Sequence, residues 1–145
     1  MLDDVTKDVT ALGGLPIFLI VTIVLFIFKY ETLAKQLFAA LIVCYSLTAV
    51  IRFFYFKSRP KQEVYRNIIE KIDASSFPSL HSMRATILAV LLSAEFSNMA
   101  LIILFSVSAF SVYLTRILLR RHYFIDVVCG AVFGVVISFI LIYFI

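Results

Sequence analysis

The sequence predicts an all-α, polytopic membrane helix bundle of about five transmembrane helices with an additional amphipathic helix at the membrane interface. Of its 145 residues, 63% are hydrophobic, and the mean hydropathy is +1.06. A soluble domain usually contains ~45–50% apolar residues, so the solvent expected for this excess is lipid. The apolar runs do not alternate as β-barrel strands do, and helices satisfy every backbone polar group in lipid. The length suits one domain over residues 1–145.

Five apolar runs are expected to form the membrane helices. They are Leu12–Phe28, Gln36–Phe56, Leu80–Ala94, Met99–Leu119 and Tyr123–Ile145. A span needs ~17–25 residues, so the third run must borrow length from its flanks. The residues before the first run are acidic, whereas a signal peptide needs a basic N-terminal region. The first run is therefore expected to be a retained helix.

The long charged connection Lys57–Pro78 has the pattern of a helix that lies in the membrane interface. Val64, Ile68, Ile69 and Ile72 fall on one helical face, and the charged residues lie off it. An amphipathic interfacial helix is expected here, with a plain connecting loop as the alternative.

Charge and motifs exclude several functional classes. The net charge of +4 would suggest nucleic acid in a soluble protein, but here the cations lie between apolar runs. They are expected to meet membrane lipids or another membrane-bound anion, and no nucleic-acid partner is predicted. Cys44 and Cys129 are expected to be packing residues. No HExxH, EF-hand, Cys/His spacing, P-loop or GxGxxG occurs, so neither a metal nor a cofactor is predicted.

Most ionisable residues of the apolar runs are expected on one side of the membrane. Alternate crossing places the end of the second run, the start of the third, the end of the fourth and the start of the fifth on the same face. That face collects Arg52, Arg59, Ser79, His81, Arg84, Arg116, His122 and Asp126. Ionisable groups in membrane helices are costly and mark a functional site by default.

These residues suggest chemistry on a phosphate. His122 and Asp126 are spaced i, i+4, so a carboxylate could accept the Nδ1–H of the imidazole and leave Nε2 as a nucleophile or base. Ser79 is a natural N-cap whose helix end could seat an anion, with His81 nearby as a general acid. Forked arginine side chains suit phosphate oxygens. The alternatives are a packing pair, an ordinary helix cap and arginines that snorkel to the interface.

Three segments carry these residues: Arg52–Pro60 reads RFFYFKSRP, Pro78–His81 reads PSLH, and Thr115–Asp126 reads TRILLRRHYFID. They resemble the motifs KxxxxxxRP, PSGH and SRxxxxxHxxxD of the type 2 phosphatidic acid phosphatase (PAP2) superfamily, in the same order and with the same internal spacing. That superfamily also includes the soluble vanadium haloperoxidases, which lack lipid-length helices. The chain departs from the motifs in Arg52 for Lys, Leu80 for Gly and Thr115 for Ser, and none of these changes removes a catalytic group.

The resemblance implies a role for each matching residue. His122 would be the nucleophile that forms a phosphohistidine, Asp126 would orient it, and His81 would protonate the leaving group. Phosphate would be bound by the remaining motif residues, which are Arg52 in the lysine's place, Arg59, Ser79, the Leu80 backbone amide and Arg116.

The expected substrate is a phosphate carried by a lipid. A small body without a soluble domain favours recognition by phosphate and tail, so an isoprenyl diphosphate (undecaprenyl or dolichyl) is predicted, with phosphatidic acid or phosphatidylglycerol phosphate as alternatives. Arg84, three residues after His81, could contact a second phosphate or merely brace a nearby group. A non-catalytic lipid-phosphate binding protein is the alternative of another class.

The membrane orientation is expected to place the active site outside the cytoplasm. Acidic residues precede the first run, whereas Lys29 and Lys35 follow it, and the first helix usually sets the orientation. The cations of the active face argue for the opposite orientation, but several of them would be there for the substrate. The resemblance agrees with an extracytoplasmic site in the cell membrane.

Overall fold

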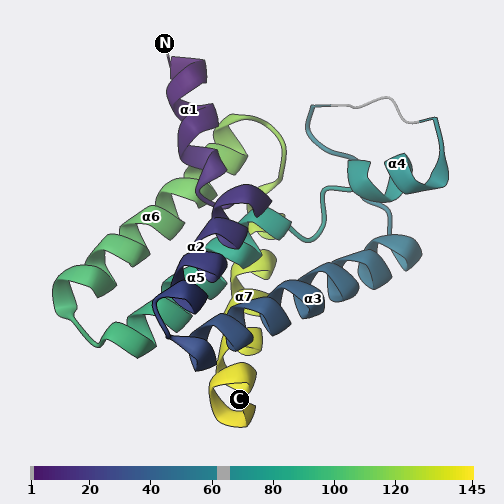
Figure 1. Cartoon of the computed structure of the whole chain (residues 1–145). Helices are drawn as coiled ribbons and strands as arrows, with labels where there is room; N and C mark the ends of the chain where they lie inside the picture. Colours follow the sequence, from purple (N-terminus) through teal and green to yellow (C-terminus); the bar gives the residue numbers. More distant parts are fainter. Residues whose placement is uncertain (1, 62–65) are drawn as a thin grey trace.

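The computed structural model describes residues 2–61 and 66–145, with side chains from Val5 onward, and these residues form helices and connecting segments only (Figure 1). The helices are α1 (Leu2–Ala11), α2 (Leu15–Ile27), α3 (Glu31–Phe54), α4 (Ile68–Ala74), α5 (Leu80–Phe96), α6 (Met99–Leu118) and α7 (Phe124–Phe144). The predicted all-α bundle is confirmed.

The helices α3, α6 and α7 are each long and apolar enough to cross a membrane. α1 and α2 together make a fourth candidate span, bent by 43° at the break between them. α5 has 17 residues, so the third apolar run gains little length from its flanks. Large apolar side chains such as Phe26, Phe110 and Phe139 are about 60% exposed, as expected for surfaces that face lipid. The protein is an integral membrane protein, and five spans is an approximate count.

The helix α5 lies at the centre of the bundle and packs against α3, α6 and α7 (Figure 1). Gly130 and Gly134 of α7 permit the approach to α5. A Cβ atom at Gly130 would lie 2.5 Å from the Ser79 carbonyl oxygen, and one at Gly134 would lie 2.7 Å from that of Met83. Small residues four apart let membrane helices pack with their backbones close together. The start of α5 is thereby held directly against α7.

The first apolar run differs from its prediction. It does not begin a helix at Leu12, because the chain breaks at Gly13 and Gly14 between α1 and α2, and Pro16 lies in the first turn of α2. A Cβ atom at Gly13 would lie 2.8 Å from both the His81 carbonyl oxygen and a methyl carbon of Val112. The break therefore lies directly against α5 and α6.

The connection between α3 and α5 contains a shorter helix than predicted. α4 has seven residues, and the Asn67 side chain caps it by accepting a hydrogen bond from the Glu70 backbone N–H at 2.8 Å. Ile68 and Ile69 are 71% and 80% exposed, whereas Val64 lies outside the described residues. The helix ends four residues before Pro78, which disfavours helical geometry in the residue that precedes it.

Candidate active site

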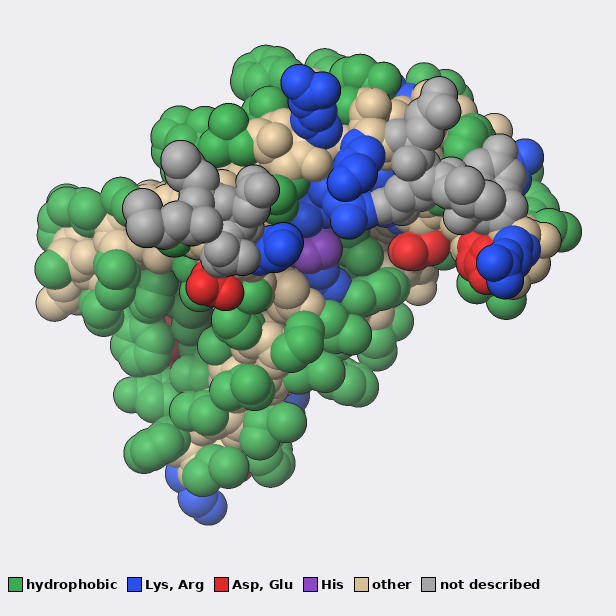
Figure 2. Space-filling model, turned by 90° about the horizontal axis from the view of Figure 1, so that it is seen from above, with side chains coloured by type: hydrophobic (Ala, Val, Ile, Leu, Met, Phe, Trp, Pro, Cys, Tyr) green, Lys and Arg blue, Asp and Glu red, His purple; other side chains and the backbone are tan. Residues whose placement is uncertain are grey.

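A polar cavity of about 270 Å³ opens where four helix ends meet. It lies at the end of α3, the start of α5, the end of α6 and the turn before α7. Its lining residues are Tyr45, Arg52, Arg59, Asp73, Leu80, His81, Arg84, Arg116 and His122. Seen from above, Lys and Arg side chains gather around a histidine within a largely hydrophobic surface (Figure 2). The convergence of these helix ends on one face, predicted from the apolar runs, is confirmed.

The His122 side chain is fixed by a backbone carbonyl rather than by a carboxylate. His122 lies in the turn before α7 and is 3% exposed, and its Nδ1 is 2.6 Å from the Ser76 carbonyl oxygen. A carbonyl oxygen only accepts hydrogen bonds, so Nδ1 carries the proton and Nε2 keeps its lone pair. The expected pairing of His122 with Asp126 is wrong, because α7 begins at Phe124 and the i, i+4 relationship of a helix does not include His122.

Asp126 has two other partners. Its Oδ1 is 2.6 Å from the Lys57 Nζ, and its Oδ2 accepts a hydrogen bond from the Tyr123 backbone N–H at 2.9 Å. The carboxylate is fully buried and does not line the cavity. Lys57 is not among the site residues predicted from the sequence. The signal that could have identified it is that a buried carboxylate needs a cation as its partner, and this lysine lies in the α3–α5 connection.

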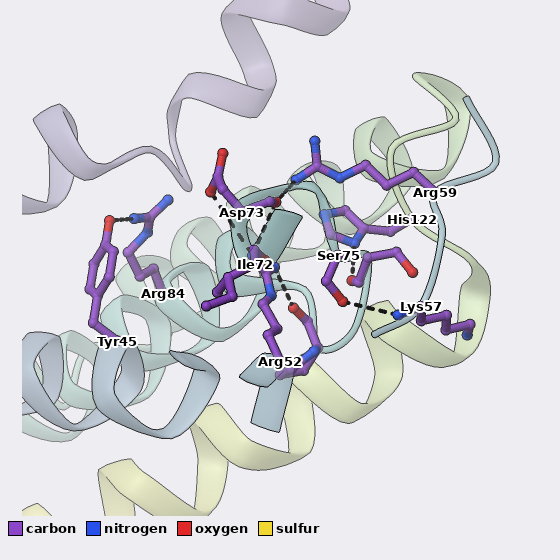
Figure 3. Close-up of polar contacts among 11 residues, drawn as sticks. Tyr45, Arg52, Lys57, Arg59, Ile72, Asp73, Ser75, Arg84 and His122 are labelled. Carbon is purple, nitrogen blue, oxygen red and sulfur yellow. Dashed lines mark hydrogen bonds and ion pairs between the residues drawn. The ribbon is translucent and has the colours of Figure 1, made fainter. Parts of the chain in front are cut away.

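The two arginines of the first motif are held by the end of α4 (Figure 3). Arg52 donates from Nη1 to the carbonyls of Ile72 and Asp73 at 3.4 and 3.3 Å, and from Nη2 to that of Pro78 at 3.0 Å. Arg59 donates from Nη2 to the Asp73 carbonyl at 2.6 Å. Carbonyls at the end of a helix favour cationic partners. This role of α4 was not predicted from the sequence.

The start of α5 brings Leu80 and His81 to the cavity. Ser79 is the N-cap, and its Oγ accepts hydrogen bonds from the backbone N–H of Ser82 at 3.4 Å and from its hydroxyl at 2.8 Å. N–H groups of a first helical turn have no acceptor within the helix and can bind an anion. Ser79 is fully buried and does not line the cavity, so its hydroxyl is placed to cap the helix rather than to face a ligand.

The segment around the α1–α2 break supports the other two arginines. Arg116 donates from Nη1 to the Thr10 hydroxyl at 3.2 Å, and its buried Nε has no partner among the described residues. Arg84 donates from Nε to the Gly13 carbonyl at 2.9 Å and from Nη1 to the Tyr45 hydroxyl at 2.6 Å. Tyr45 is not among the site residues predicted from the sequence, although it lies seven residues before Arg52 and so on the same helical face.

The cavity is strongly cationic. Among the described residues, four guanidiniums and one carboxylate line it. The carboxylate belongs to Asp73, whose side chain is 89% exposed and 4.0 Å from Arg52. Burial, followed by the charge of Arg116, holds the pKa of His122 well below its usual value, although the hydrogen bond to Ser76 acts in the opposite direction. Burial also lowers the pKa of Arg59, and Asp73 opposes this shift. The site therefore combines a neutral imidazole with an excess of positive charge, which is suited to a phosphate group.

Comparisons with known proteins agree with a site that is suited to a phosphate group. Residues 33–145 match the PAP2 superfamily. LpxE of Aquifex aeolicus is 25% identical, with a TM-score of 0.83 over 99% of this chain and 86% of that one. The first transmembrane PAP2-type phosphatidylglycerolphosphate phosphatase from Bacillus subtilis is 23% identical and has the same fold, with a TM-score of 0.77 over 99% of this chain and 76% of that one. No curated protein matches the sequence. The chain belongs to the PAP2 superfamily and is an integral membrane lipid phosphatase of that family.

Proposed function

We propose that the protein removes the terminal phosphate of a lipid diphosphate through a phosphohistidine on His122, without a metal ion. The observation that carries this proposal is the hydrogen bond from His122 Nδ1 to the Ser76 carbonyl at 2.6 Å, within a cavity lined by four arginines. It leaves Nε2 as a free nucleophile at a site where phosphate oxygens would be neutralised.

In the first step, His122 Nε2 attacks the terminal phosphorus while the bond to the bridging oxygen breaks. His81 gives a proton to that oxygen, and a lipid monophosphate leaves. Arg59, Arg116, Arg52 and the first-turn N–H groups of α5 stabilise the charge on the transferring group.

In the second step, water attacks the phosphorus of the phosphohistidine. His81, now neutral, takes a proton from this water, and the bond between phosphorus and Nε2 breaks. Inorganic phosphate leaves, and both histidines return to their starting states. The cycle consumes one water and needs no other reactant.

Arg84 supports a diphosphate as the substrate class. Its guanidinium lines the cavity and is only 3% exposed, and its contacts with Gly13 and Tyr45 fix it in place. A diphosphate monoester carries more negative charge than a phosphate monoester, and a fourth guanidinium offers it a further charge-assisted contact. The single hydrocarbon tail of an isoprenyl diphosphate suits a protein whose described residues form a helical bundle with an apolar outer surface.

We further propose that the cavity faces away from the cytoplasm. Lys29 lies in the connection between α2 and α3, and Lys35 lies near the start of α3, opposite the end of α3 that carries Arg52. Short cytoplasmic connections usually carry the excess of positive charge. In a variant with both native cysteines replaced by alanine, Lys61→Cys should react with an impermeant thiol reagent on intact cells, whereas Ser97→Cys should react only after permeabilisation. The reverse pattern would overturn this orientation.

The catalytic proposal is tested by phosphate release from purified protein in detergent with EDTA. An isoprenyl diphosphate, its monophosphate, phosphatidic acid and phosphatidylglycerol phosphate form the substrate panel. The wild type should release phosphate with EDTA present, with the highest kcat/KM on the diphosphate, and His122→Ala should be inactive although it is folded. The radiolabelled terminal phosphate should be trapped on the wild type as an acid-labile, alkali-stable adduct. Near-normal activity of His122→Ala would overturn the mechanism, and binding of the panel without turnover would identify a lipid-phosphate binder.

A further inference from the structure

We propose that Lys57, which matches no motif residue, is a positioning residue that holds His122 in place through its ion pair with Asp126. This inference rests on the proposed function of His122 as the nucleophile. The structure links Lys57 to the imidazole by a short series of contacts.

The first contact is the ion pair itself. Lys57 Nζ lies 2.6 Å from Asp126 Oδ1, and the side chains are 24% and 0% exposed. The same Nζ lies 4.7 Å from the centre of the Tyr123 ring and 6.0 Å from that of Phe77. An aromatic face attracts a cation at such distances, so the ammonium is held on more than one side. Removing it would leave a fully buried carboxylate without its cation, which is strongly destabilising to the local arrangement.

The second set of contacts joins Lys57 to the residue that binds the imidazole. The Lys57 backbone N–H donates to the Ser75 hydroxyl at 3.2 Å, and the Lys57 carbonyl accepts from the Ser76 backbone N–H at 2.8 Å. The Ser76 carbonyl in turn accepts from His122 Nδ1 at 2.6 Å. Lys57 therefore fixes one side of the peptide segment whose carbonyl sets the tautomer of His122.

The third set of contacts comes from Asp126. Its Oδ2 accepts from the backbone N–H of Tyr123, the residue that follows His122, at 2.9 Å. Its backbone carbonyl accepts from the Ser79 N–H at 3.0 Å, next to the start of α5. The ion pair thus joins the three segments that carry the motifs, and His122 is restrained from both its Ser76 and its Tyr123 sides. Asp126 acts on His122 through these contacts, because it does not touch the imidazole.

The test uses Lys57→Met, Lys57→Arg, Asp126→Asn and the double variant Lys57→Met/Asp126→Asn. Lys61→Met is the matched control, since it removes the same charge from an exposed position of the same segment. Each protein is purified in detergent, its folding is checked by its thermal midpoint and elution profile, and kcat and KM are measured on the preferred lipid substrate. Because Lys57 does not line the cavity, its loss should act on kcat and leave KM nearly unchanged.

We expect Lys57→Met to lower kcat by ~10-fold or more with KM within ~2-fold, and Lys57→Arg to recover most of the loss. The double variant should have the kcat of Asp126→Asn, because the two side chains act as one unit. A kcat for Lys57→Met within ~2-fold of that of Lys61→Met, or an effect on KM alone, would overturn the inference. Where Lys57→Met does not fold, the double variant decides: a kcat for Lys57→Met/Asp126→Asn more than ~3-fold below that of Asp126→Asn would contradict the inference. Activity in His122→Ala would instead contradict the proposed function, so the two failures are distinguishable.

Discussion

The guanidinium of Arg52 donates a hydrogen bond to the carbonyl oxygen of Pro78 at 3.0 Å. This contact ties the last turn of α3 to the residue before Ser79, the N-cap of α5. The other terminal nitrogen of Arg52 donates to two carbonyls at the end of α4. Arg52 therefore holds the backbone that surrounds the cavity as well as lining it.

Substitution of Arg52 separates its charge from its forked geometry. Arg52→Lys keeps the charge but cannot bridge Pro78 and the end of α4 together, so kcat/KM should fall by ~10-fold. Arg52→Met also loses the charge, so kcat/KM for this variant should fall by ~100-fold. Steady-state kinetics and the thermal midpoint of each variant test this. Equal losses in the two variants would show that the charge makes no separate contribution.

Arg84→Met should change the substrate preference. The variant loses one charge-assisted contact with the second phosphate, so kcat/KM on the lipid diphosphate should fall by ~10-fold or more, with a much smaller effect on the matching monophosphate. Tyr45→Phe, which removes the hydroxyl that holds Arg84, should shift the preference in the same direction by less. Arg66→Met, at an exposed position, is the control. Equal losses on both substrates would make Arg84 a structural residue.

The buried, neutral His122 should make stability depend on pH. Burial and the charge of Arg116 hold its pKa well below the value of ~6.5 that it regains on unfolding. The contribution of neutral His122 to the free energy of unfolding is thus fully present above about pH 6.5. It is lost as the pH falls below that value, and the free energy of unfolding then decreases by at most about 1.4 kcal/mol per pH unit. Thermal midpoints between about pH 7.5 and pH 5 should fall less steeply for His122→Asn than for the wild type. Parallel curves would contradict this prediction.

The exposed face of α4 should contribute to the use of lipid substrates. Ile68 and Ile69 are 71% and 80% exposed beside the cavity side of the bundle, as expected for side chains that enter the membrane interface. Ile68→Ser/Ile69→Ser should lower kcat/KM on a long-tailed substrate more than on a short, soluble one. Met99→Ser, at the opposite end of the bundle, should affect neither. Equal losses on the two substrates would argue against a role in lipid access.

The sequence was sufficient to predict which helix ends meet. The apolar runs cross the membrane in alternate directions, and this determines which helix ends lie on the same side. Arg52, Arg59, His81, Arg84, Arg116 and His122 accordingly line one cavity. Periodicity could not predict where a helix begins. His122 and Asp126 have helical spacing, but the capping interaction between Tyr123 and Asp126 starts α7 after His122.

Contacts between segments that are distant in the chain could also not be predicted from the sequence. Lys57 and Asp126 are 69 positions apart, and the choice of this lysine depends on how the α3–α5 connection packs against α7. The polar composition of α1 gave no reason to expect a helix there, and Thr10 contacts Arg116 only because α1 packs against α6. Such contacts follow from tertiary packing, which overrides local propensity.

The close approach at Gly130 restricts how the sequence can vary during evolution. A methyl group there would lie 2.5 Å from the Ser79 carbonyl oxygen, so even alanine would displace the first turn of α5 and the His81 that it carries. Selection on turnover would then remove variants at a position that touches no phosphate. Natural relatives that acquire a larger residue at this point should carry a compensating change at the start of α5, and such paired changes would reveal the contact without a structure.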